Sequence, residues 1–118
     1  MRIRWLVAAL FLSVLLLGLH LYAEAHAWYW IYRWFDIPMH LLGGFTIGVF
    51  SVAILGKFRP LLFVVIVLGA AVGWEAFEYL SGITYNEPKY WFDTTHDLLD
   101  DALGGIAAYV IARFSVWR

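Results

Sequence analysis

The sequence predicts an all-α, polytopic integral membrane protein with four transmembrane helices in one compact bundle. Apolar residues make up 64% of the 118 residues and charged residues only 14%, against roughly 25% charged in soluble domains. Aromatic residues make up 19%, which suits a protein with aromatic side chains at both membrane interfaces. A spanning helix needs about 20 mostly apolar residues. Four stretches meet that need, and they form one transmembrane domain over residues 1–118: 5–22, 37–55, 61–80 and 97–117.

The first stretch carries one polar residue, His20, near its end. Arg2 and Arg4 precede it and small residues follow it, as in a secretory signal. We expect a retained spanning helix, because the apolar stretch is longer than the core of a signal sequence. The next segment, 23–36, is rich in Trp and Tyr. That composition predicts an interfacial helix or a re-entrant turn at the level of the lipid headgroups.

The remaining stretches are separated by short polar segments. A tight turn at 56–60 ends in Pro60, and proline favours the first position of a helix. The third stretch is uncharged until Glu75. A polar-aromatic loop is expected at 81–92, followed by the fourth stretch, which is acidic in its first turn and a half.

Charge excludes some classes and predicts an orientation. The net charge of −1 and the lack of a basic patch argue against a nucleic-acid partner, and the lack of cysteine excludes disulfides and thiolate metal sites. Short loops rich in Lys and Arg face the cytoplasm, which places both termini there in a multi-pass protein of the cell (cytoplasmic) membrane. The basic residues assigned to that side are Arg2, Arg4, Lys57, Arg59, Arg113 and Arg118, against Arg33 and Lys89 on the other.

Ionisable residues from three helices are expected at one depth, near the outer face. Asp36 and His40 are four residues apart and Glu75 and Glu78 three apart, so each pair shares a helix face. Such residues cost about 2.5–3.5 kcal/mol each at the centre of a spanning helix and less near the interface, so by default they mark function. The candidate site consists of Asp36, His40, Glu75, Glu78, Asp97, Asp100 and Asp101.

Glycine pairs on the same helices favour their close approach. The pairs are Gly43–Gly44, Gly69–Gly73 and Gly104–Gly105. We expect them at helix–helix interfaces, either within the chain or between the subunits of a homo-oligomer.

Carboxylates that converge in this way need a proton, a basic partner or a cation. Few basic residues are near, so we expect a divalent metal ion as cofactor, with Zn, Mn, Mg, Ca and Fe not distinguished. In an enzyme acting on an envelope lipid or lipid-linked substrate, a metal-activated water would be the nucleophile and Glu75 or Glu78 the general base.

Two other functions remain open from the sequence. The first is a non-enzymatic membrane scaffold or partner subunit, in which protonated carboxylates and His–carboxylate pairs satisfy the charges. The second is an ion or proton relay, against which the cytoplasmic halves of all four predicted helices lack ionisable groups.

Three ordered motifs resemble those of the YjdF-type family of small bacterial membrane proteins and, more distantly, VanZ-like proteins. The resemblance implies a polytopic helical membrane fold and, from the VanZ-like side, a role at the cell envelope. Ile37 and Asp101 depart from the VanZ-like pattern. The motifs are Asp36-x-x-x-His40-x-x-Gly43, Trp74-Glu75-x-x-Glu78 and Asp93-Thr94-x-x-Asp97-x-x-x-Asp101-x-x-Gly104.

The predicted topology can be tested by cysteine labelling, because the chain has no cysteine of its own. A cysteine placed at Asn86 should react with an impermeant reagent added from outside intact cells, and one at Lys57 should not. Labelling of the Asn86 position only from the cytoplasm would overturn the orientation.

Overall fold

A computed structural model describes residues 1–82 and 89–118 of the chain. All regular structure in these residues is helical, which confirms the predicted all-α fold. The elements are α1 (Ile3–Ala25), α2 (Trp28–Ile31), the 3-10 turn η1 (Arg33–Phe35), α3 (Asp36–Leu55), α4 (Pro60–Leu80) and α5 (Tyr90–Ser115).

The boundaries of α1, α3 and α4 lie within three residues of the predicted ones. Pro60 occupies the start of α4, where its missing N–H costs nothing. Gly56 follows α3 with φ of +61°, a conformation that glycine adopts without strain. Gly56 and Pro60 therefore indicate where α3 ends and where α4 begins.

The start of the last helix was predicted wrongly. We expected it at Asp97, but α5 begins at Tyr90, so the expected loop at 81–92 is shorter. Lys89, with φ of +68°, turns the chain just before this helix. Asn86 and the other residues at 83–88 lie outside the described residues.

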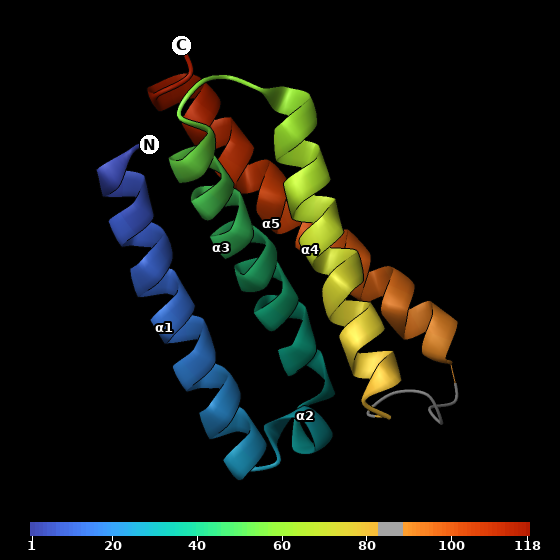
Figure 1. The fold of residues 1–118 in the computed structure, drawn as a ribbon. Helices are drawn as coiled ribbons and strands as arrows, with labels where there is room; N and C mark the ends of the chain where they lie inside the picture. The colour runs from blue at the N-terminus through green and yellow to red at the C-terminus, as the bar shows by residue number, and fades with distance from the viewer. Residues whose placement is uncertain (83–88) are drawn as a thin grey trace.

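The aromatic segment after α1 folds into two short helical turns, α2 and η1. The Trp28 ring meets those of Tyr22 and Phe35 with centroids 5.2 and 5.3 Å apart. A short helix therefore forms where the sequence allowed either a helix or a re-entrant turn, and Figure 1 shows it at the end of the bundle opposite the termini.

Three helical segments of the described chain, not four, are long and apolar enough to cross a membrane: Ile3–Ala25, Arg33–Leu55 and Pro60–Leu80. The prediction of four such helices is wrong for α5. This helix has 26 residues, but aspartates interrupt its first half and carry a high cost of insertion. The part after Asp101 is shorter than the about 20 residues that span a bilayer.

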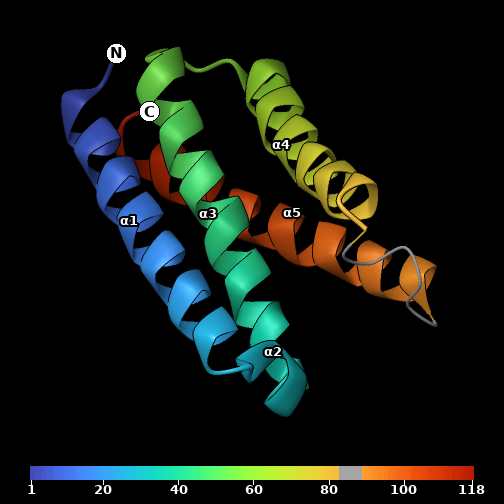
Figure 2. The same ribbon diagram turned by 60° about the horizontal axis from the view of Figure 1, so that its bottom comes forward.

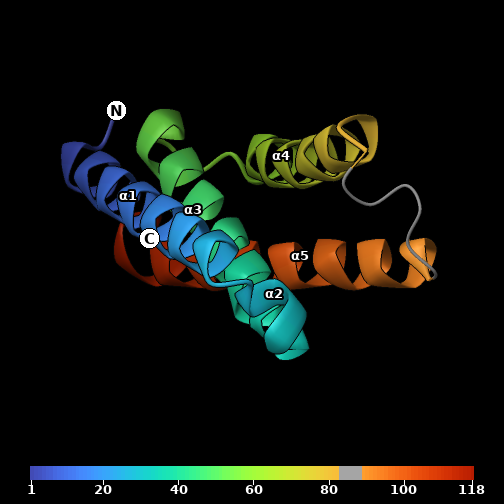
Figure 3. The same cartoon turned by 90° about the horizontal axis from the view of Figure 1, so that it is seen from below.

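Helix α3 occupies the middle of the fold. Figure 1 shows α1 beside α3, with both chain ends at one end of the bundle. Figure 2, turned by 60°, shows α5 crossing α3 at a steep angle. Figure 3 shows α4 and α5 as separate layers that run in opposite directions. Every long helix therefore packs on α3.

The α3–α5 crossing is a contact between backbones. A Cβ added to Gly44 would overlap the carbonyl oxygen of Asp101, and one added to Gly104 would overlap that of Leu41. Gly105 faces the Val67 side chain of α4. These glycines thus lie at helix–helix interfaces, as the sequence indicated.

The glycine pair of α4 does not follow that expectation within the chain. At Gly69 and Gly73, no atom of a neighbouring element in the described part of the chain lies within 4 Å of an added Cβ. Contact of this face with another subunit stays a prediction.

The apolar core fills the end of the bundle that holds the termini. It joins Ala9 of α1 and Val52 of α3 to the C-terminal part of α5. The Arg2 guanidinium donates to the Gly56 and Val116 carbonyl oxygens at 2.9 and 2.8 Å, which ties the start of α1 to both. Outward faces remain apolar, as at Phe11 and Leu61, which suits a lipid environment.

Replacing Gly44 with alanine should lower the free energy of unfolding by about 1–3 kcal/mol, because the new methyl group overlaps backbone that cannot move aside. The matched control is Gly18→Ala, where an added Cβ meets nothing within 4 Å. Thermal unfolding in detergent compares the two variants. Equal melting temperatures would contradict the backbone contact.

Candidate functional site

His40, in the second turn of α3, is the centre of a cluster of ionisable side chains. Its ring is buried, and Nδ1 lies 3.2 Å from Oδ1 of Asp101. The other ring nitrogen, Nε2, lies 3.5 Å from Oδ1 of Asp36 and 3.6 Å from Oδ2 of Asp97. Three carboxylates therefore surround one imidazole.

Helix geometry explains this arrangement. Asp36 lies one turn before His40 on α3, so both share a face. Asp97 and Asp101 are one turn apart on α5, and they reach His40 because Gly44 lets the two backbones touch. The sequence determines the spacing within each helix, whereas the contact between α3 and α5 depends on tertiary packing.

Helix α4 adds two more carboxylates. Within residues 1–82 and 89–118, the structure forms three groups of three residues, in each of which one potential ligand atom per residue lies within 4.8 Å of the others. Six of the seven residues expected from the sequence take part. The groups are Asp36, His40 and Asp97; His40, Glu75 and Asp101; and Glu75, Glu78 and Asp97.

Glu75 is the most deeply buried of these acids. It is 5% exposed, and its Oε1 atom has no hydrogen-bond partner among the described residues. A buried polar atom without a partner costs about 1–3 kcal/mol, more if charged. This oxygen therefore points to a proton or a cation within the cluster.

Asp100 is not brought into any of the three groups. It is 8% exposed, and its Oδ2 atom has no hydrogen-bond partner. One residue along a helix is about 100° of rotation, so Asp100 leaves α5 in a different direction from Asp101. Its expected place among the metal ligands has no such geometric support.

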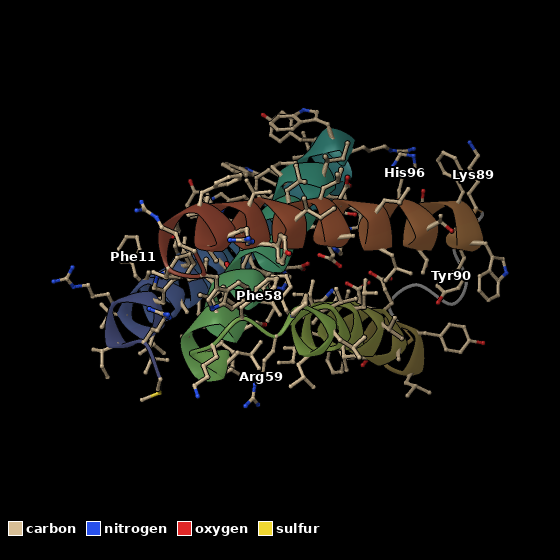
Figure 4. The ribbon with its side chains drawn as sticks, turned by 90° about the horizontal axis from the view of Figure 1, so that it is seen from above. Phe11, Phe58, Arg59, Lys89, Tyr90 and His96 are labelled. Atoms are coloured by element: carbon tan, nitrogen blue, oxygen red, sulfur yellow. The ribbon has the colours of Figure 1, made fainter. Side chains whose placement is uncertain are left out.

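Other polar residues at this end lie apart from the cluster. Asp93 and Glu24 are exposed. In Figure 4, His96 of α5 and Lys89, just before this helix, project away from α4, whereas Tyr90 projects toward α4. His20 is hydrogen-bonded to Tyr29, with Nδ1 2.9 Å from the hydroxyl.

Tyr29, in α2, lies close enough to the acidic residues for their charges to affect its hydroxyl. Burial and, after it, the negative charges of Asp36, Glu24 and Glu78 together raise the pKa of its hydroxyl to about 12. The sequence placed Tyr29 only in the aromatic segment. Its nearness to the acids depends on how the segment between α1 and α3 packs against the other helices, which is a tertiary property.

The two ring nitrogens of His40 have different neighbours: Nδ1 lies beside one carboxylate and Nε2 beside two. With the ring proton on Nδ1, the imidazole donates to Asp101 and its Nε2 lone pair faces two carboxylates. In the described part of the chain, the ion pairs of Asp36, Asp97 and Asp101 run to His40 and to no lysine or arginine. The arrangement can therefore hold a proton or a metal ion at Nε2.

Comparison with known proteins identifies one family. The family model described as "Predicted membrane protein (DUF2238)" matches residues 2–118. No curated protein and no solved structure matches the chain.

Removal of the His40 ring should lower the free energy of unfolding by about 3 kcal/mol in chelator-treated protein, because buried carboxylates lose their shared partner. The matched control is His96→Ala, an exposed histidine, which should change it by less than about 0.5 kcal/mol. Thermal unfolding in detergent measures both. If His40→Ala behaves like the control, the cluster does not stabilise the apo fold.

Proposed function

The chain belongs to the DUF2238 family of predicted membrane proteins, whose model covers nearly its whole length, and from this premise we propose that it binds divalent metal at the α3–α4–α5 cluster. The expected YjdF-type resemblance is confirmed, because this is the same family. Candidate spanning helices agree with a membrane protein. We propose in addition that the cluster binds a metal ion and that the protein uses this ion in its function.

One observation carries the proposal: the Nε2 atom of His40 faces oxygen atoms of both Asp36 and Asp97, while Nδ1 lies beside Asp101. An imidazole held by a carboxylate on one nitrogen and facing anionic ligands with the other is the usual setting of a metal-binding histidine. Glu75, with its unpartnered buried oxygen, supports the same conclusion.

A proton alone satisfies this cluster less completely than a metal ion. A proton at Nε2 would be shared by two carboxylates and would leave the Glu75 oxygen without a partner. A divalent ion accepts several donors at once. The donor set of carboxylates and one imidazole suits Mg²⁺, Ca²⁺, Mn²⁺, Fe²⁺ or Zn²⁺.

We propose that the site serves an envelope lipid or a lipid-linked substrate. The cluster lies at the end of the bundle that carries the aromatic α2–η1 segment, and the Asp36 side chain is 44% exposed, so a headgroup can reach it. The bias in Lys and Arg supports an outward-facing site with both termini in the cytoplasm. A role at the cell envelope, implied by the VanZ-like resemblance, belongs to the same proposal.

If the protein is an enzyme, the bound ion supplies Lewis acidity toward a phosphoryl or carbonyl oxygen of the substrate. In that case Glu75 or Glu78 would be the general base that accepts a proton from an attacking water. Asp36 and His40 hold the opposite side of the site.

One observation favours a second function, a structural scaffold. The close backbone contact between Gly44 of α3 and Asp101 of α5 lies within the cluster itself. The polar residues would then fix the α3–α5 crossing without any metal.

Metal binding should raise the melting temperature of the purified protein. A ligand at 100 times its dissociation constant stabilises the folded state by about 2.7 kcal/mol, and at least one of Mn²⁺, Zn²⁺, Mg²⁺, Ca²⁺ and Fe²⁺ should show this effect. Glu75→Gln and Asp97→Asn should abolish most of it, because each removes an anionic ligand while keeping its shape. Elemental analysis of the same samples checks for bound metal.

The matched control is Asp93→Asn, which removes an exposed acid one turn from Asp97 on the same helix. It should respond to metal as the wild type does. Absence of bound metal, together with unchanged melting on addition of every ion, would reject the metal site and favour the scaffold.

A further inference from the structure

We propose that the cluster holds two divalent ions bridged by Asp97, and that Asp101 is a positioning residue that fixes His40 without binding metal. This inference rests on the proposed metal binding and specifies how many ions the site takes and how the residues divide between them.

The spread of the donor atoms exceeds one coordination sphere. Oxygen and nitrogen ligands lie about 2.0–2.6 Å from a divalent ion, so donors of one ion are no more than about 5 Å apart. Among the residues that the structure describes, such a limit is met in three groups of three residues and not in one group of six. Several carboxylates therefore surround more than one ion-sized position.

The orientation of His40 distinguishes the groups. Nε2 is the nitrogen that faces Asp36 and Asp97, which defines the first ion position. Glu75, Glu78 and Asp97 define the second. Asp97 is the one residue common to both, so its two oxygens can bridge ions about 3.5–4 Å apart, the usual spacing of two-metal sites.

The third group, which contains His40, Glu75 and Asp101, does not define a third ion position. Nδ1 of His40 lies 3.2 Å from Oδ1 of Asp101, at hydrogen-bonding distance. A histidine that binds metal through one nitrogen commonly donates its other N–H to a carboxylate, which fixes the orientation of the ring. Asp101 therefore acts through His40.

The charge of the cluster agrees with two ions. The cluster has five carboxylates, which carry five negative charges when ionised, and two divalent cations balance four of them: Asp36, Glu75, Glu78, Asp97 and Asp101. One divalent cation would leave an excess of three in a partly dehydrated volume, and uncompensated buried charge is costly.

The test counts metal in the full-length protein in detergent. After loading with Mn²⁺ and, in parallel, with Zn²⁺, elemental analysis should give two ions per chain, and the Mn²⁺ sample should show the electron paramagnetic resonance spectrum of an exchange-coupled pair. One ion per chain with an uncoupled Mn²⁺ spectrum would overturn the two-ion site and leave the proposed metal binding standing. No ion with either metal would overturn both.

Variants test the division of residues. Asp36→Asn and Glu78→Gln should each lower the count from two ions to one and abolish the exchange coupling, because each removes a ligand of one position. Asp93→Asn, the exposed control on α5, should keep two coupled ions. If both cluster variants keep two ions, the assignment is wrong.

Asp101→Asn should keep two ions per chain but weaken binding about 10–100-fold, as expected for loss of a carboxylate that orients a metal-binding histidine. A count of one ion in this variant would show that Asp101 is itself a ligand. The spectrum of the wild-type Mn²⁺ complex does not depend on any variant, so the number of ions is decided even if one variant fails to fold.

Discussion

The close approach of α3 and α5 is the constraint on which the rest of the structure depends. Gly44 and Gly104 let the two backbones touch where any larger residue would overlap a carbonyl group. At that separation, Asp97 and Asp101 reach across to His40. A wider crossing would leave the same side chains facing solvent or lipid headgroups. The site is therefore a consequence of helix packing, not of any one helix.

The two ends of the bundle are stabilised in different ways. At the end with the termini, Val52, Phe63 and Ala108 pack in an apolar core, and Arg2 donates to backbone carbonyls. At the other end, like charges meet where the backbones of α3 and α5 touch. Burial favours the first end and opposes the second unless a cation is shared there. This asymmetry explains why function is assigned to the acidic end.

Helix α5 contributes to both the apolar core and the acidic cluster. Its C-terminal half contributes Ala108 and Ala112 to the core, while its N-terminal half supplies the aspartates. The same aspartates make it too polar to rank with the spanning helices α1, α3 and α4. Its start at Tyr90 was missed because hydropathy marks apolar segments, and the first turns of this helix are polar and aromatic.

The sequence by itself determined the helical class, the bounds of the apolar helices and the pairs that share a helix face, because hydropathy and the 3.6-residue period are local properties. It also identified six residues that the structure brings together. Only the tertiary structure decided that Asp100 lies outside the three ligand groups and that Gly69 and Gly73 contact no neighbouring helix in the described part of the chain. It also decided which nitrogen of His40 faces which carboxylate. Those outcomes depend on the crossing angle and depth of α5 against α3 and α4, and such distances between segments remote in sequence leave no local pattern.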